Sequence, residues 1–342
     1  MSRGRTRSVT VRELAAATGL SIATVSRVLN DYHHVAPETR DLVHAAMDRL
    51  ATQVARPRTA ARPPDVVRPA VFVRCPYQLT DYFGFIVSSI AETLQLHGRH
   101  PILDAGELAQ AEAVLPTLPG RPGIGGAILI LPPEPSEQLE RLQAGGFPFV
   151  VVDPRTAPPR DIPAVSAAHF SGARAVTEHL LQLGHRRIGV LAGPQNWLAG
   201  KARLAGHTSA LADAGLLTDP ALIRCAEPTT QFGHDGADDL LSGLQPPTAI
   251  VGFNDKVAVG ALAAAAARGR RVPADLSVTG FDDIDLAQAT TPPLTTVRQP
   301  LQEMGRIAVS LIIRLLDGHQ VEALHIELGT ELVVRGSTGP RM

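Results

Sequence analysis

The stretch VTVRELAAATGLSIATVSRVLN, residues 9–30, encodes two short helices joined by a tight turn. Thr10 and Glu13 have the spacing of a capping box, in which each side chain satisfies a backbone amide at the start of a helix. Gly19 is suited to follow that helix because glycine readily adopts a left-handed conformation. Ser21 then caps a second helix that covers the rest of the stretch. A helix, a turn containing glycine and a second helix form the helix-turn-helix pattern.

The next residues predict a third helix. Pro37 fits the first position of a helix, where its missing amide hydrogen costs no hydrogen bond. Its apolar face is formed by Leu42, Val43, Ala46 and Leu50. Three short helices of this kind make a small core of their own, so we place a DNA-binding domain at residues 1–51.

The second helix carries polar groups on its exposed side. Its hydroxyl and amide groups can bond phosphate oxygens, and Arg27 can form two hydrogen bonds to a guanine edge. Ile22 and Ala23 can contact bases through apolar groups, for example against a thymine methyl. From these residues alone, an ordinary amphipathic surface helix remains an alternative.

Residues 9–30 resemble the DNA-binding signature of the lactose-repressor (LacI/GalR) family, and VAPETRDLVHAAMDRL (35–50) resembles its third helix. The resemblance implies a sequence-specific DNA-binding transcription regulator. The base-reading positions that it implies are Ile22, Ala23 and Arg27. It places at phosphate-contacting positions Ser21, Thr24, Ser26 and Asn30. Two departures are small: Leu14 stands where valine is usual, and Ala36 replaces a helix-capping serine.

The charge distribution separates the head from the rest of the 342-residue chain, a length that predicts two or three domains. Residues 1–62 contain ten arginines and five acids, a net charge of +5. The remainder holds 22 basic and 28 acidic residues, a net charge of −6. A basic head on an acidic body predicts that the head alone meets a polyanion such as DNA.

Cysteine content and hydropathy exclude several classes of protein. Cys75 and Cys225 are the two cysteines, and neither belongs to a CxxC or Cys/His cluster, which argues against a disulfide framework and a metal site. The N-terminal residues lack the apolar core of a signal peptide. No apolar run reaches the ~18 residues of a membrane span. We therefore expect a cytoplasmic protein, associated with the nucleoid when bound to DNA, without a metal or cofactor.

From residue 68 onward, short apolar runs alternate with helical patterns. The runs are AVFVRC (70–75), GAILIL (126–131), PFVVVD (148–153), RRIGVLAG (186–193), TAIVGF (248–253) and LSVTGF (276–281). Continuous apolar strands alternating with helices predict parallel sheets covered on both faces, and the length suggests two such lobes. Ligands of these sheets bind beyond the carboxyl ends of the strands. Polar residues at such ends are Asp153, Asn254-Asp255 and Asp282-Asp283.

The body also resembles the same family, in its periplasmic-binding-protein-like core, most clearly over residues 179–194, 252–262 and 272–309. The expected fold is therefore an α-helical helix-turn-helix head plus an α/β periplasmic-binding-protein-like body of two doubly wound parallel-sheet lobes. We place this effector-binding and dimerisation domain at residues 68–338. The expected lobe boundaries are about 68–162 and 293–322 for lobe 1, and about 163–292 and 323–338 for lobe 2.

The resemblance implies a set of effector-binding residues in the cleft between the lobes. Arg203 would hold hydroxyls or a carboxylate of the ligand, and Asn254 and Asp282 would bond it from strand ends. Aromatic contacts are implied at Tyr82, Phe83, Trp197 and Phe232. Alternatives remain for three of these residues: a salt-bridged helix residue for Arg203, a turn cap for Asp282, and a surface or dimer residue for Trp197. Asp283 is expected to cap a turn.

Two departures bear on the nature of the ligand. Ala168 and His169 stand where the family usually has Asp-Asn, which removes a carboxylate from the cleft, and His169 would either replace one hydrogen bond or be solvated. Arg74, at the end of the first strand, suits an anionic ligand. By family frequency, the expected effector is a sugar.

The competing functional classes are an enzyme and a solute-binding protein. A glycosidase would need two carboxylates flanking one bond, but neighbours such as Asp282 and Asp283 on an extended segment point to opposite faces. No GxSxG, HExxH, Walker or strand-linked GxGxxG motif occurs. An importer's binding protein would need a signal peptide and no head. We predict a homodimeric repressor of carbohydrate uptake or utilisation genes, released from operator DNA by its effector, and no enzymatic activity.

Residues 52–67 form a linker, whose stretch TQVARPRTAARPP (52–64) departs from the family's hinge helix. Ala61 replaces the leucine that wedges into the minor groove, and Pro57 and Pro63-Pro64 leave room for little helix. We therefore expect a tether whose arginines meet phosphates or a narrow minor groove. These arginines are Arg56, Arg58 and Arg62.

Overall fold

The computed structural model describes residues 68–106, 109–110, 113–321 and 324–341, together with six single residues nearer the N-terminus. The chain divides into two compact units, Met1–Val67 and Arg68–Met342. In the first unit, Thr18, Thr24, Val28, Thr39 and Val43 are helical. Val43 is buried, as predicted for the apolar face of the third helix, and Val28 is buried as well.

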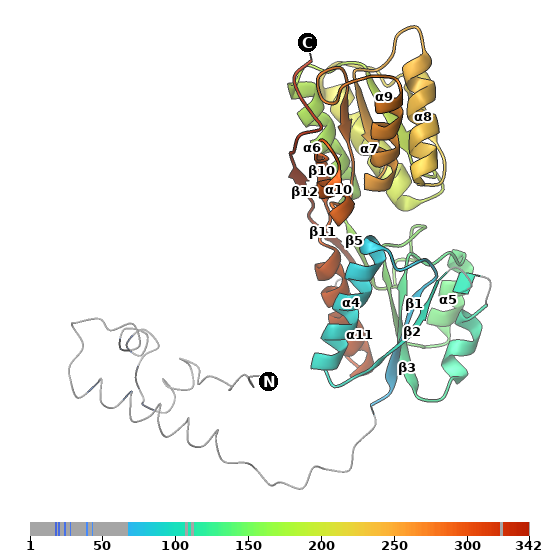
Figure 1. The fold of residues 1–342 in the computed structure, drawn as a ribbon. Coiled ribbons are helices and arrows are strands. Elements are labelled where there is room, and N and C mark those ends of the chain that lie inside the picture. The colour runs from blue at the N-terminus through green and yellow to red at the C-terminus, as the bar shows by residue number, and fades with distance from the viewer. Residues whose placement is uncertain are drawn as a thin grey trace. The chain divides into compact units, whose positions relative to one another are not determined.

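The larger unit is built from two α/β lobes (Figure 1). The first lobe contains β1 (Ala70–Cys75), α4 (Asp81–Leu96), β2 (Pro101–Ala105), η2 (Leu115–Gly120), β3 (Ile124–Ile130), α5 (Ser136–Ala144), β4 (Phe149–Val152), β5 (Ala164–Ala167), α11 (Leu301–Leu316) and β11 (His325–Leu328). Its six strands are parallel and lie in the order β11-β5-β4-β3-β1-β2. Helices α4 and α11 cover one face, while α5 and η2 cover the other.

The second lobe has a smaller sheet. It contains α6 (His169–Gln182), β6 (Ile188–Ala192), α7 (Leu198–Asp213), η3 (Pro220–Leu222), β7 (Ile223–Cys225), α8 (Thr230–Ser242), β8 (Ala249–Gly252), α9 (Asp255–Ala267), β9 (Ser277–Thr279), α10 (Asp285–Ala289), β10 (Thr296–Arg298) and β12 (Glu331–Val333). Four parallel strands lie in the order β7-β6-β8-β9, and β10 pairs with β12 as an antiparallel ribbon. The packed helix pairs are α6 with α7 and α8 with α9.

The two parallel-sheet lobes agree with the predicted fold class, but the strands shift the lobe boundaries. β5 and β11 hydrogen-bond within the first sheet, so the chain leaves this lobe after residues 167 and 328 rather than at about 162 and 322. β10 lies beside α6 of the second lobe, so the return to the first lobe comes after residue 298 rather than at about 293. The first of these shifts arises because β5 is a short strand, AVSA, without an obvious apolar run.

Glycines allow the helix pairs of the second lobe to pack closely. A Cβ on Gly233 of α8 would lie 2.1 Å from the Val257 carbonyl oxygen of α9. A Cβ on Gly206 of α7 would lie 2.2 Å from the carbonyl oxygen of Phe170 in α6. Any larger residue at these positions must therefore push two helices apart.

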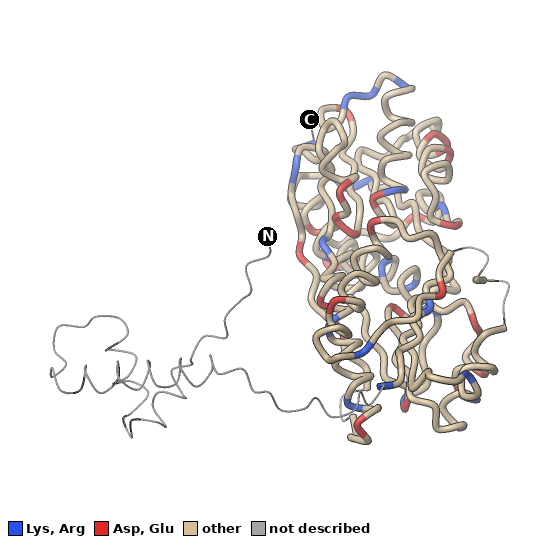
Figure 2. Tube along the Cα trace, turned by 60° about the horizontal axis from the view of Figure 1, so that its bottom comes forward, with Lys and Arg blue, Asp and Glu red and all other residues tan. Residues whose placement is uncertain are grey.

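Charged residues are distributed over the body. Figure 2 shows basic and acidic positions interspersed over the view it gives of the two lobes.

None of the helices in the described residues is long and apolar enough to cross a membrane.

Candidate effector-binding site

A cavity of about 520 Å³ lies between the two lobes of the larger unit. It opens beyond the carboxyl ends of parallel strands, where ligands of such sheets bind. Six of the seven predicted effector residues line it: Tyr82, Phe83, Trp197, Arg203, Asn254 and Asp282. The sequence therefore located part of the cavity wall.

A buried hydrogen-bond network joins the lobes at the inner wall. Asp153, directly after β4, accepts hydrogen bonds from Tyr82 Oη at 2.6 Å and from His169 Nε2 at 2.9 Å. The Nδ1 atom of His169 lies 3.3 Å from Arg203 Nη2. These partners assign the proton of a neutral His169 ring to Nε2, since Nδ1 faces a donor. His169 does not line the cavity, but it fixes Asp153 and Arg203 against each other.

Arg203 belongs to the first turns of α7, and its guanidinium lies against two aromatic rings. Its guanidinium carbon lies 3.7 Å from the ring centre of Phe281 and 4.4 Å from that of Phe253. Arg203 Nη1 donates to the carbonyl oxygen of Phe253 at 2.5 Å, and Nη2 lies 3.6 Å from an oxygen of Asp282. The predicted alternative of a salt-bridged helix residue thus holds alongside a place in the cavity wall. Its buried Nε atom has no hydrogen-bond partner within the described part of the protein.

The two carboxyls nearest Arg203 have opposite pKa shifts. Burial raises the pKa of Asp282 to about 6, although Arg203 and a 2.6 Å hydrogen bond from Gln299 act in the other direction. Burial also acts to raise the pKa of Asp153, but the contacts with His169, Tyr82 and Arg203 outweigh it and hold the pKa below its usual value. Asp153 is therefore a stable anion, whereas Asp282 changes protonation near neutral pH.

Asp255 positions the segment that carries Asp282. It is fully buried, and its two carboxyl oxygens accept hydrogen bonds from Thr296 Oγ1 at 2.5 Å and from the amide of Ile284 at 3.0 Å. Burial, with Asp282 nearby, raises its pKa well above the usual value. Asp255 thus ties the start of α9 to the loop after β9.

Helix caps place two further polar groups at the cavity. Asn254 caps α9, because its Oδ1 accepts from the amide of Val257 at 3.0 Å. This leaves the side-chain nitrogen of Asn254 for a ligand. Thr229 caps α8 in the same way, accepting from the amide of Phe232 at 3.0 Å, and also lines the cavity.

Strained backbone accompanies the strand ends. Leu131, Asp153, Asp282 and Asp283 have φ values of 45°, 50°, 114° and 57°, a region that residues other than glycine rarely adopt. The first three line the cavity. Such strain persists where the surrounding structure holds the residue in place, and it concentrates at ligand sites.

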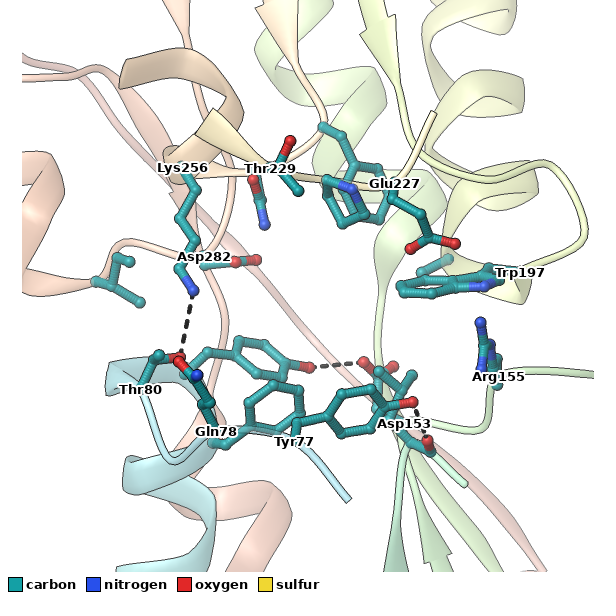
Figure 3. Close-up of a pocket in the computed structure, with 18 of the residues that line it drawn as sticks. Tyr77, Gln78, Thr80, Asp153, Arg155, Trp197, Glu227, Thr229, Lys256 and Asp282 are labelled. Carbon is teal, nitrogen blue, oxygen red and sulfur yellow. Dashed lines mark hydrogen bonds between the residues drawn. The ribbon is translucent and has the colours of Figure 1, made fainter. Parts of the chain in front are cut away.

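Aromatic side chains of the first lobe form one wall of the cavity (Figure 3). The rings of Tyr77 and Phe83 stack at 4.9 Å between centres with an angle of 3° between planes. Tyr82 meets Phe83 edge to face at 5.0 Å. Tyr77 Oη donates to the carbonyl oxygen of Leu131 at 2.8 Å, and burial raises the pKa of Tyr77 to about 12.

Several contacts cross between the lobes at the cavity rim. The guanidinium of Arg155 lies 4.6 Å from the ring centre of Trp197, and the amide of Leu198 donates to the carbonyl oxygen of Arg155 at 2.8 Å. Lys256 Nζ lies 3.5 Å from Thr80 Oγ1 (Figure 3). Trp197 is only 8 % exposed, so of its two predicted alternatives the surface position is excluded.

Family models and a sequence relative show which proteins this chain resembles. The model for bacterial regulatory proteins of the lacI family matches residues 10–51, and the model for a periplasmic binding protein-like domain matches residues 177–338. The HTH-type transcriptional repressor CytR of Escherichia coli (strain K12) is 32% identical over 335 residues, which cover 97% of this chain and 96% of the repressor. The chain belongs to the lacI family of bacterial regulatory proteins.

Solved structures of other lacI-family proteins agree over nearly the whole chain. A complex of the transcriptional regulator CelR with cellobiose has a TM-score of 0.73 and 29% identity, covering 96% of this chain and 99% of that one. The lac repressor dimer bound to operator and the anti-inducer ONPF has a TM-score of 0.69 and 28% identity, covering 97% and 100%. As a lacI-family member, the chain is a DNA-binding transcription regulator.

Two residues expected at the lacI-family cleft lie away from the cavity. Phe232 does not line the cavity but packs partly buried against the core between α8 and α9, because Thr229 occupies the start of the helix that faces the ligand space. Arg74 is 1% exposed, so its side chain is not available to contact a ligand. Instead its guanidinium bonds Asp104 at 2.5 Å, Glu134 and a backbone carbonyl.

Asp283 has a structural role through ion pairs. Its carboxyl accepts from Arg298 at 2.7 Å and from Arg335 at 2.5 Å, and it does not line the cavity. These ion pairs hold the loop after β9 to the ribbon of β10 and β12.

The cavity also contains residues that the sequence did not single out. Those with titratable side chains are Tyr77, Arg155, Glu227 and Lys256. Tyr77, Arg155 and Lys256 each follow an apolar run or a strand-end acid by a few residues, which is a weak signal, because it does not show which way the loop folds, and Glu227 follows no such run. Of the predicted DNA contacts, Thr24 is helical and partly exposed, and the others in the head and linker lie outside the described residues.

Proposed function

We propose that this lacI-family regulator is a homodimeric repressor of carbohydrate uptake or utilisation genes, and that a sugar bound in the cavity releases it from operator DNA. The class of the ligand is inferred from the balance of charge in the cavity wall. Three acids, Asp153, Glu227 and Asp282, oppose three bases, Arg155, Arg203 and Lys256. A neutral ligand rich in hydroxyl groups suits this wall, since hydroxyls both donate and accept hydrogen bonds.

The aromatic wall supports the same ligand class. The stacked rings of Tyr77 and Phe83 offer apolar surface to the carbon faces of a sugar ring, while the charged groups reach its hydroxyls. The regulator CelR, with 29% identity over nearly the full length, has been solved with cellobiose. A sugar is therefore the first class of effector to test.

An enzymatic role is disfavoured by the arrangement of the carboxyls. Asp283 faces Arg298 and Arg335 outside the cavity, so Asp282 and Asp283 do not flank one substrate bond. Asp153 and Asp255 already accept two hydrogen bonds each, which suits positioning rather than proton transfer.

The proposed mechanism couples lobe closure to the DNA-binding heads. The contacts of Arg155 with Trp197, Lys256 with Thr80 and Asp153 with His169 all cross between lobes. A ligand touching both lobes would favour one closure angle, and it can shift the equilibrium only by its different affinity for the two forms. The linker, residues 52–67, would carry the change to heads that read two operator half-sites with Ile22, Ala23 and Arg27.

The proposal is tested with the full-length protein and a fluorescent fragment of its own promoter. We expect specific binding in the cytoplasmic salt range, weakening when a sugar is added, and no hydrolysis of nitrophenyl glycosides. Arg27→Ala should weaken operator binding by ~1–3 kcal/mol and relax the preference at one base pair. Arg121→Ala, in the body and outside the cavity, is the matched control. A protein that hydrolyses glycosides and ignores DNA would contradict the proposal.

A further inference from the structure

Polar side chains lie at two ends of the cavity, and an aromatic wall runs along the space between these ends. Figure 3 shows Lys256, Thr80 and Asp282 toward one side and Trp197, Arg155 and Glu227 toward the other. Lys256 and Asp282 lie at one end, where Arg203 is 3.6 Å from Asp282, and Arg155 and Glu227 lie at the other. The following inference rests on the proposed function, because it concerns the ligand of the same cavity.

The end formed by Arg155 and Glu227 is free to bind. Within the described part of the chain, neither side chain takes part in an ion pair, although both line the cavity. Arg155 comes from the first lobe, after β4, and Glu227 from the second, after β7. Neighbouring hydroxyls of one sugar ring can accept from Arg155 and donate to Glu227, and hydrogen bonds to charged groups are the stronger kind.

The opposite end offers a second, equivalent set of groups. Asp282 presents a carboxyl, Asn254 has its side-chain nitrogen to donate, and Lys256 makes only one long contact within the described residues, at 3.5 Å, with Thr80. A single ring bonded here leaves Arg155 and Glu227 without a partner. A single ring bonded at Arg155 leaves the groups around Asp282 unused.

The space between the ends fits a second ring. Given a share of ~30 Å³ per molecule of liquid water, a cavity of about 520 Å³ equals ~17 waters. It also falls within the ~300–1,000 Å³ range of pockets that enclose drug-sized ligands. The stacked Tyr77 and Phe83 lie along the wall between the ends, where the link between two rings would pass.

We infer that the effector is a neutral disaccharide, one ring of which is bonded by Asp282, Asn254 and Lys256 and the other by Arg155 and Glu227. Arg155 is then the residue that selects two rings over one. Trp197 reports on the occupied end because it lies against Arg155 and is the only tryptophan of the chain.

The test uses full-length protein and calorimetric titration. The probes are maltose, cellobiose, lactose, sucrose and trehalose, each compared with its component monosaccharides, and also adenosine, cytidine and glucose 6-phosphate. We expect one disaccharide to bind at least about tenfold more tightly than either of its components, the equivalent of one hydrogen bond to a charged group. The same disaccharide should change the emission of Trp197.

Variants identify the end that makes the difference. Arg155→Ala and Glu227→Gln should each lower disaccharide affinity more than monosaccharide affinity, so that the preference falls toward equality. Glu227 is exposed, so its substitution keeps the fold and guards against a misfolded Arg155→Ala. The matched control is Arg121→Ala, which removes another arginine lying over an aromatic ring, Phe72, outside the cavity. It should retain the full preference.

The possible failures are distinguishable. Equal or tighter binding of a monosaccharide overturns the two-ring inference and leaves the proposed sugar-responsive regulator intact. Preferential binding of a nucleoside or of glucose 6-phosphate overturns the inference in favour of another ligand. If none of the sugars binds, the sugar effector of the proposed function fails with it. A preference that survives in both Arg155→Ala and Glu227→Gln removes these residues from ligand selection.

Discussion

Replacing Arg203 by methionine tests whether a buried cation organises the cavity. Arg203→Met keeps an unbranched chain of similar length between the rings of Phe253 and Phe281 but removes the guanidinium. The variant lacks the 2.5 Å hydrogen bond to the Phe253 carbonyl oxygen and the cation 3.6 Å from Asp282. The comparison therefore tests the guanidinium, with its charge and hydrogen bonds, while the aliphatic part of the side chain is kept.

The expected loss of stability follows from these interactions. Breaking a buried ion pair by removing one partner costs ~3–5 kcal/mol. We expect the lower value, about 3 kcal/mol, since Asp282 keeps its 2.6 Å hydrogen bond from Gln299. At ~2–4 °C per kcal/mol for a unit of this size, the melting temperature should fall by ~6–12 °C.

The effect should also depend on pH. Arg203 is the main influence that lowers the pKa of Asp282, so without it this pKa lies further above about 6. Protonation then removes the uncompensated charge in the variant. The difference in stability between Arg203→Met and the unmodified protein should therefore shrink as the pH falls toward ~6, and it should level off below that pH, where Asp282 is protonated in both proteins.

The assay is thermal unfolding by circular dichroism between pH 5 and pH 8, combined with release of operator DNA by the bound sugar. The control is Arg174→Met on α6, whose arginine pairs with Glu178 and Asp213 at the surface and should matter little. Arg203→Met should abolish the sugar response and retain operator binding at temperatures where it is folded. Unchanged stability together with an unchanged sugar response would refute the reasoning.

Three further predictions concern other parts of the protein. Because the pKa of Asp282 is raised to about 6 from ~4 in the unfolded chain, its contribution to stability is full below pH ~4 and is lost as the pH rises to ~6. Thermal unfolding curves of Asp282→Asn and the unmodified protein should therefore diverge across that range, and parallel curves would contradict the raised pKa. Changing the three linker arginines to alanine should reduce the salt dependence of operator binding, measured by fluorescence anisotropy. The slope of log binding constant against log salt concentration should fall by ~0.9 for each phosphate that the variant no longer neutralises. An unchanged slope would remove the linker from the DNA interface. Gly233→Ala should destabilise the protein by ~1–3 kcal/mol in urea unfolding, since its Cβ would lie 2.1 Å from the Val257 carbonyl oxygen; a variant of full stability would show that α8 and α9 can separate freely.

Local sequence patterns determined much of this protein. The helix-turn-helix stretch predicted helical positions, and the pattern of the third helix predicted the burial of Val43. The apolar runs predicted parallel strands, and polar residues at their ends, such as Asp282, indicated the wall of the cavity. These properties depend on neighbours within a few residues, so periodicity and capping reveal them.

Tertiary structure alone decided which distant groups meet. Asp153, Tyr82, His169 and Arg203 come from four separate elements, and only the order of the strands and the approach of the lobes brings them into one network. The same approach set Arg155 against Trp197. No periodic pattern encodes such contacts, because they depend on how loops leave the strands and on how the two lobes face each other. The sequence therefore indicated a ligand wall, while the packing of the lobes decided its shape, its balance of charge and the residues available to a ligand.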